Sequence, residues 1–373
     1  MPAAVSSTSD QPVEPSLNIP LHIRYWTRCL KTLLPTGYQE QDSSRIILGF
    51  FILTSLDLLD RLDQHITPEE RSSFITFIYR CQHPGGGFRS FPGTDFGEAK
   101  RSEENGRWDP ANVAGTYFAL AALLILGDDL GKVNRRETLS WIRNLQRQDG
   151  SFGEIAAGED GDVDGGQDVR FCFLAVLTCV LLGEEENSRQ NIERVIDAEA
   201  LTRFILDSQA YDGGIAKRPK CESHAGSTYC GISTLKLLNR LPTSKQASTA
   251  ETTTPQRASS EFIQNLLHWL SQRQTTMLCD YQDFNTLEEE QESSVEQATN
   301  PPATDNPSFT VLNKTPALPP EILSFESLSL DSEPPTIAGM NGRVNKPADT
   351  CYSFWVGATL AVSNHPEYQG CKL

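Results

Sequence analysis

The sequence has no CxxC pair, no long apolar run and no excess of positive charge. Its nine cysteines are scattered over 373 residues, which excludes the dense disulfide framework of a small secreted protein. Residues 1–20 contain neither an apolar signal core nor a positive start, and no run of eighteen apolar residues occurs. We therefore expect a cytoplasmic protein without a membrane span. The net charge of −17 argues against nucleic acid as a partner, because nucleic acid selects basic surfaces.

Four segments are apolar nearly all round, which is typical of helices buried on more than one side. They span residues 43–62, 112–128, 168–183 and 227–241. Amphipathic segments such as 135–148 and 198–209 lie between them, and little of the alternation typical of strands is visible. The sequence therefore predicts an all-α protein.

A glutamine recurs at the end of the amphipathic segments, at Gln82, Gln146, Gln209 and Gln272, with spacings of 64, 63 and 63 residues. Three of the four are followed by a glycine-containing turn and then by an aromatic or aliphatic residue. Each repeat is thus an outer amphipathic helix, a glycine turn and an apolar inner helix, and such repeats must stack to bury a continuous face. Inner helices that are apolar all round favour a closed ring of hairpins over an open solenoid.

Two polar segments interrupt this pattern. Residues 275–339 hold twelve Asp or Glu and one Lys, and residues 242–260 are a shorter strip of the same Ser/Thr/Pro-rich kind. Both are predicted to be disordered insertions, as is an N-terminal tail over residues 1–19. One toroidal domain is predicted over residues 20–373, and the global acidity mostly reflects the longer insertion.

Asp349 and Cys351 lie two residues apart where an apolar helix is predicted to begin. A carboxylate and a thiolate are both zinc ligands, and a catalytic zinc site needs a third protein ligand and an open position. The alternative is structural: Asp349 caps the helix that starts near Thr350, and Cys351 packs in the core. The spacing alone leaves both open.

Cationic and phenolic residues surround this pair and recur at the start of other inner helices. Arg343, Lys346 and Tyr352 flank it, and cations near a helix N-terminus form an anion site, although a solvated basic loop has the same composition. His224 and Arg170 lie at the start of two other apolar helices. His224 can be purely structural. Arg170 either pairs with Asp168 or faces a central cavity. In a ring of hairpins all these residues share one rim, which suits a long hydrophobic molecule with an anionic head.

Residues 342–360, GRVNKPADTCYSFWVGATL, and residues 222–232, ESHAGSTYCGI, together with the glutamine–glycine repeats, closely resemble the β subunits of protein prenyltransferases. Within that family the resemblance is greatest to the geranylgeranyltransferase type I β subunit. The resemblance covers roughly residues 21–274 and 339–362. It implies an α/α toroid bound to a separate prenyltransferase α subunit. The resulting heterodimer is expected to transfer a geranylgeranyl group from geranylgeranyl diphosphate to the cysteine of a C-terminal CaaX motif through a zinc-bound thiolate. The expected protein substrates are CaaX-ending proteins such as small GTPases.

The resemblance also implies roles for individual residues. Asp349 and Cys351 match two of three zinc ligands, and Tyr352 is grouped with them as catalytic. The implied diphosphate-binding set is His224, Arg343, Lys346 and Tyr352. The implied prenyl and peptide cavity is lined by Ile47, Phe51, Arg170, Phe173 and Trp355.

The resemblance further implies the chain length of the isoprenoid. Farnesyl enzymes place a tryptophan at the cavity floor, where this sequence has Ile47, with Phe51 one turn on. A smaller side chain leaves room for one more isoprene unit, and no tryptophan occurs between Trp26 and Trp108.

One departure from the family is expected to matter. The family continues with another helix pair and a histidine that completes the zinc site, so the toroid is predicted to be incomplete at its C-terminal end. His365 lies in a polar tail and is not expected to replace that ligand. The alternatives are a farnesyltransferase or Rab-type β subunit, or a truncated, non-catalytic isoform that binds only the α subunit or lipid. A terpene cyclase-like toroid is less favoured, because no acidic motif is predicted in the cavity.

Overall fold

The computed structural model describes residues 17–33, 36–106, 108–156, 163–183, 188–242, 256–276 and 338–363. The N-terminal tail up to residue 16, most of both predicted insertions and His365 lie outside these ranges. The predicted 242–260 strip overlaps them at its end, where the Ala258 amide donates to the Arg240 carbonyl at 2.9 Å. Helix α1 begins at Ile19, at the boundary predicted for the tail.

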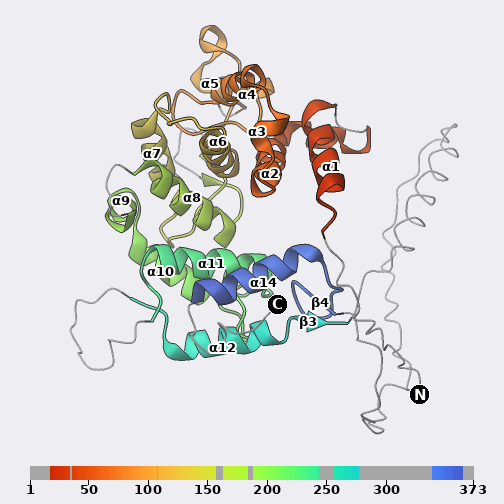
Figure 1. Cartoon of the computed structure of the whole chain (residues 1–373). Coiled ribbons are helices and arrows are strands. Elements are labelled where there is room, and N and C mark those ends of the chain that lie inside the picture. The colour runs from red at the N-terminus through yellow and green to blue at the C-terminus, as the bar shows by residue number, and fades with distance from the viewer. Residues whose placement is uncertain are drawn as a thin grey trace, which may run out of the picture.

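Five apolar helices form the inner layer, as predicted. They are α2 (Arg45–Leu58), α6 (Val113–Ile125), α8 (Val169–Leu182), α11 (Ala225–Leu237) and α14 (Thr350–Ser363). Each packs against the next in this order, and α1 (Ile19–Lys31) packs on α2. Together they follow an arc in Figure 1. The four sequence segments chosen for their apolar character coincide with the first four of these helices.

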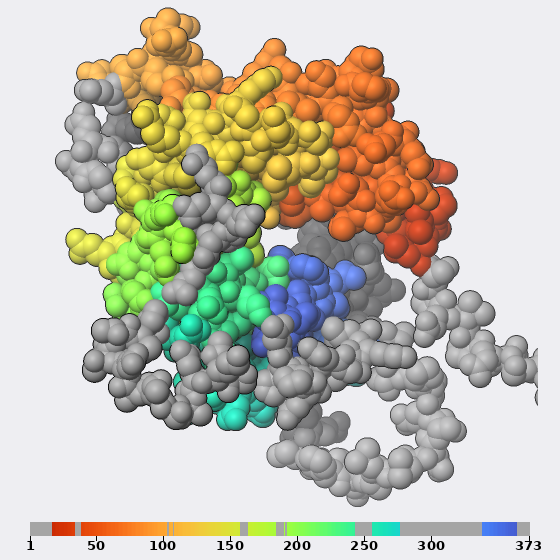
Figure 2. All heavy atoms as spheres, turned by 60° about the vertical axis from the view of Figure 1, so that its left-hand side comes forward, coloured from red at the N-terminus to blue at the C-terminus, as the bar shows by residue number. Residues whose placement is uncertain are grey.

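The outer helices are amphipathic and each contacts the inner helix that follows it in the chain. They are α4 (Pro68–Arg80), α7 (Arg135–Asn144), α10 (Ala198–Asp207) and α12 (Ser260–Ser271). Shorter helices are α3 (Leu62–His65), α5 (Glu103–Gly106) and α9 (Ser188–Val195), with 3₁₀ segments at Thr36–Ser44, Pro92–Thr94 and Glu98–Lys100. Figure 2 shows the two halves from another side, with the N-terminal half (red to yellow) above the C-terminal half (green to blue).

Two short antiparallel ribbons complete the described structure. Strand β1 (Ile155–Ala156) pairs with β2 (Val163–Asp164), and β3 (Gln274–Thr275) pairs with β4 (Gly339–Met340). The second ribbon holds together the two ends of the long acidic segment, which the sequence pattern did not predict. No helix in the described ranges combines the length and apolar character that crossing a membrane requires.

The recurring glutamines connect one repeat to the next. The Gln146 side-chain amide donates to the Asp197 carbonyl at 2.9 Å, and its Oε1 accepts the Asp197 N–H at 2.8 Å. Gln82 makes the same two-point contact with Lys132 and Asn134, and Gln209 donates to Phe262. Since each partner lies within three residues of the start of the next outer helix, the glutamine period is a period of inter-repeat hydrogen bonds. Gln272 differs, because its amide contacts His268 on its own helix.

The glycine four residues after each of Gln82, Gln146 and Gln209 is required by geometry. Gly150 has φ +89°, and a Cβ there would lie 2.2 Å from the Ala200 carbonyl carbon in α10. Gly86 and Gly213 make equally close approaches to the next outer helices. We expect Gly150→Ala to lower the free energy of unfolding by at least about 2 kcal/mol, because it combines a positive φ with a backbone clash. Urea unfolding measures this.

The matched control is Gly166→Ala, since a Cβ at Gly166 would meet nothing within 4 Å. Equal urea midpoints for the two variants would contradict the assignment of Gly150 as a packing position.

Candidate active site

Asp349 and Cys351 lie at the N-terminal end of α14. The Asp349 Oδ1 accepts the Cys351 backbone N–H at 2.8 Å, so the predicted capping role is confirmed. The thiol of Cys351 is exposed, so the alternative prediction of a core cysteine is wrong. The reason is its place in the first turn of α14, where the helix is open to solvent.

The electrostatics of this pair suit a cation. Hydrogen bonds from Cys351 lower the pKa of Asp349, and partial desolvation together with the Asp349 carboxylate raises the pKa of Cys351 to about 11. A thiol with this pKa is protonated at neutral pH, and a bound metal ion would displace the proton. The two donors fit zinc in kind. The described residues contain no cluster of three or more His, Cys, Asp or Glu that would complete a metal site.

His224 caps α11 and reaches across to α14. Its Nδ1 accepts the Gly226 N–H at 3.1 Å, and its Nε2 lies 3.3 Å from the Tyr352 hydroxyl. Because Nδ1 is an acceptor, the neutral ring carries its proton on Nε2 and donates to Tyr352. The tyrosine proton is then free to point to another acceptor. Burial, followed by the nearby Arg343 and Arg170, lowers the pKa of His224.

The cations predicted at this rim lie around His224. Arg343 bonds Glu222 at 2.6 Å, and the Ala225 amide donates to the Gly342 carbonyl at 2.8 Å, which attaches the 338–346 segment to the start of α11. Of the two possibilities for Arg170, local pairing is observed: its guanidinium donates to Asp168 at 2.7 Å. Lys346 is exposed. The structure thus brings together His224, Arg343, Arg170 and Tyr352.

Aromatic side chains continue from this rim along the inner helices. Tyr229 lies 5.6 Å from Phe173, 5.2 Å from Trp355 and 5.6 Å from Phe354, between ring centroids. Phe354 is 57% exposed. The three helices α8, α11 and α14 therefore share one aromatic wall.

A second aromatic group lies on α2 and α6. Phe51 is 5.6 Å from Phe118, Phe50 is 6.4 Å from Tyr117, and Ile47 is half-buried on the same helix as Phe51. Burial, and secondarily Tyr229, raises the pKa of Tyr117. Helix α6 packs against α8, which carries Phe173 of the first aromatic group.

Sequence reasoning missed Tyr117, Phe118, Tyr229 and Phe354 as wall residues, and Glu222 as the partner of Arg343. The aromatics had a signal that could have found them, because each inner helix carries aromatic residues within its first two turns. Glu222 had none, since its partner is 121 residues away.

Two histidines are expected to make the free energy of unfolding depend on pH. Burial, as the largest cause, lowers the pKa of both His83 and His224. The unfolded chain takes up these protons near pH 6.5, whereas the folded chain resists them. Below pH 6.5 the unfolded state therefore binds more protons, and we expect the free energy of unfolding to fall as the pH falls from 7.5 to 5.5. Urea titrations at several pH values should show this decline, and the free energy of unfolding should depend less steeply on pH in H83Q/H224Q. An unchanged dependence would show that these two histidines are not its source.

The sequence matches the prenyltransferase alpha-alpha toroid domain over residues 17–369. The chain belongs to this family. Among relatives, it is 29% identical over 347 residues to the geranylgeranyl transferase type-1 subunit beta of Arabidopsis thaliana, covering 91% of this chain and 70% of the relative. It is 26% identical to the subunit of the same name from Dictyostelium discoideum, covering 90% of this chain and 74% of that one.

A farnesyl relative matches over a shorter region. The protein farnesyltransferase subunit beta of Arabidopsis thaliana is 29% identical over 58% of this chain and 38% of the relative. The fold is similar to that of a Candida albicans protein geranylgeranyltransferase-I complexed with GGPP, with a TM-score of 0.62, 25% identity, and coverage of 94% of this chain and 78% of that one. The toroid family and the likeness to type I geranylgeranyl transferase β subunits predicted from the sequence are both confirmed.

Proposed function

We propose that this chain is the β subunit of a type I protein geranylgeranyltransferase, which joins a prenyltransferase α subunit and transfers a geranylgeranyl group to the cysteine of a CaaX motif. The supporting observation is the likeness to type-1 β subunits over nine-tenths of the chain, together with the likeness to a geranylgeranyltransferase-I solved with GGPP. The expected protein substrates are CaaX-ending proteins such as small GTPases, and the expected location is the cytoplasm.

The residues have separate tasks in this reaction. Zinc held by Asp349 and Cys351, with a further ligand outside the described residues, would supply the positive charge that keeps a substrate thiol deprotonated near neutral pH. Arg343 and Tyr352, which lie beside His224, would donate together with Lys346 to the diphosphate oxygens, where negative charge grows as the bond to C1 breaks. His224 donates to the Tyr352 oxygen and so leaves the tyrosine proton for the leaving group. The aromatic wall excludes water from the isoprenoid.

Ile47 provides a test of isoprenoid length. We expect Ile47→Trp to lower kcat/KM with geranylgeranyl diphosphate by roughly 10–200-fold while largely keeping transfer of the shorter farnesyl group, because pockets discriminate by steric fit on this scale. Competition between the two diphosphates measures the ratio. Ile47→Leu conserves volume and serves as the control. An unchanged ratio in I47W would remove Ile47 from the cavity floor.

The proposal is tested by co-expressing the chain with an α subunit and following labelled geranylgeranyl and farnesyl diphosphates onto a CaaL peptide, with zinc quantified in the same preparation. Preferential geranylgeranyl transfer with bound zinc supports it. Preferential farnesyl transfer would instead assign a farnesyltransferase β subunit, and binding of the α subunit without transfer or zinc would assign a non-catalytic form.

A further inference from the structure

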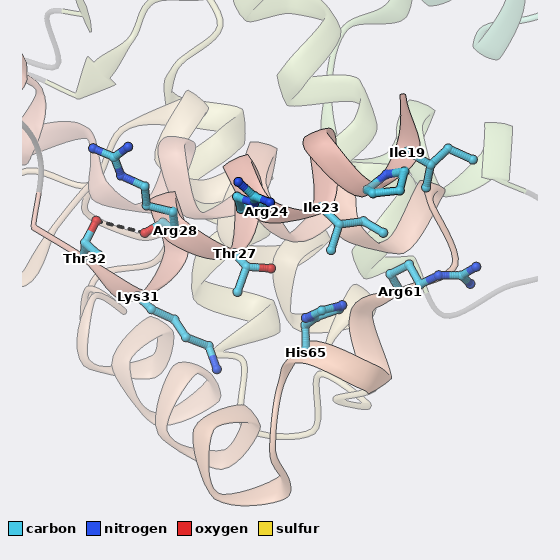
Figure 3. Close-up of a pocket in the computed structure, with 10 residues that line it drawn as sticks. Ile19, Ile23, Arg24, Thr27, Arg28, Lys31, Thr32, Arg61 and His65 are labelled. Atoms are coloured by element: carbon cyan, nitrogen blue, oxygen red, sulfur yellow. Dashed lines mark hydrogen bonds between the residues drawn. The ribbon is translucent and has the colours of Figure 1, made fainter. Parts of the chain in front are cut away.

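A basic groove lies at the N-terminal end of the arc of helices, between α1 and the short segment Arg61–His65. Its volume is about 920 Å³. Ile19 and Ile23 contribute apolar side chains, and Arg24, Arg28 and Lys31 contribute cations, as Figure 3 shows. The groove is distant in sequence from every residue assigned to prenyl transfer on α8, α11 and α14.

The charge of this groove is only partly balanced. Lys31 bonds Glu70 at 2.9 Å and Arg61 lies 3.8 Å from Asp60. Arg24 and Arg28 are exposed and form no ion pair within the described residues. An occupant with carboxylates and apolar side chains would complement both these arginines and the isoleucines beside them.

This chain carries such a segment itself. Residues 277–337 contain twelve Asp or Glu against one Lys, and they intersperse acids with apolar residues, as in EILSFESLSLD at 321–331. Strands β3 and β4 fix where this segment leaves and rejoins the fold. The stretch 321–331 lies 8–18 residues before Gly339, and that length of chain spans at most about 26–65 Å when extended.

We propose that the basic groove on α1 binds the acidic segment 277–337 of the same chain. Arg24 and Arg28 attract the carboxylates, and Ile19 and Ile23 receive the apolar side chains between them. The contact attaches the acidic segment to α1. It does not depend on the proposed transfer activity.

Zero-length carbodiimide coupling tests this in the full-length chain, because it joins an amine only to a carboxylate in direct contact. Lys31 is the amine in the groove, and its coupling to Glu70 is an internal positive control. We expect peptides that join Lys31 to carboxylates of 277–337 by mass spectrometry. Their yield should fall roughly fivefold or more in R24E/R28E, since two ion pairs are lost.

Three controls decide between outcomes. R136E/R203E makes the same charge change on α7 and α10 and should leave the yield unchanged. Exposed Lys100 should not couple to the segment. A mixture of isotopically heavy and light chains should give only products within one chain. Four results would each overturn the proposal. They are coupling of Lys31 to Glu70 alone, equal coupling of the segment to Lys100, an unchanged yield in R24E/R28E, and products that join heavy to light chains.

Discussion

Replacing Cys351 with alanine is expected to empty the proposed zinc site and to lower prenyl transfer by at least about 100-fold. Loss of even an outer-shell partner typically reduces metal affinity 10–100-fold, and Cys351 would be a direct ligand. Without a cation beside it, the substrate thiol is only a few per cent ionised at pH 7. Zinc content and transfer rate, measured on the same preparation, should therefore fall together.

Cys221 provides the matched control. It is a half-buried cysteine in the segment that precedes His224, and Cys221→Ala should keep both zinc and activity. Full zinc occupancy in C351A, or equal losses in the two variants, would show that the exposed thiol of α14 is not a ligand.

Replacing Arg343 with alanine is expected to lower kcat about 10²–10³-fold, which corresponds to about 2.7–4 kcal/mol of transition-state stabilisation. Arg343 lies beside His224 and Tyr352, and its guanidinium is held by Glu222 at 2.6 Å. Such a donor acts on the charge that develops on the departing diphosphate. The expected loss is therefore larger in the chemical step, measured in a single turnover, than in the binding of geranylgeranyl diphosphate.

Two variants separate this role from general effects of charge. Arg343→Lys keeps the positive charge but loses the planar fork that suits phosphate oxygens, and it should fall between wild type and R343A. Arg136→Ala removes a guanidinium whose side chain is 92% exposed on α7, and it should keep full activity. If R343A weakened only the binding of the diphosphate substrate, Arg343 would be a docking residue without a part in the chemical step.

The layered helical fold was predictable from sequence because its signals are local. Helices such as α8 are apolar on every side, and Gln146 and Gly150 recur with the repeat, so pattern alone indicates stacked hairpins. What the sequence could not show depends on contacts between distant segments. The pairing of Glu222 with Arg343 exists only because the 338–346 segment is attached to α11.

The surface sites were less predictable for a different reason. Arg24 and Arg28 are spaced as on any solvated helix face, and only the position of Arg61–His65 opposite α1 makes them part of a groove. The exposure of Cys351 likewise follows from where α14 begins, since a small thiol in an apolar run is usually buried. Its capping neighbour, Asp349, was predictable because capping is a local interaction.

The ribbon of β3 and β4 has a consequence for how this chain tolerates changes in length. It holds Thr275 opposite Gly339, so α12 and α14 are joined through a fixed point whatever sequence lies between. The entropy of closing a loop grows only logarithmically, by about 0.6 kcal/mol for each doubling of its length. Residues can therefore be gained or lost between Thr275 and Gly339 at little cost to the packing of α12 and α14.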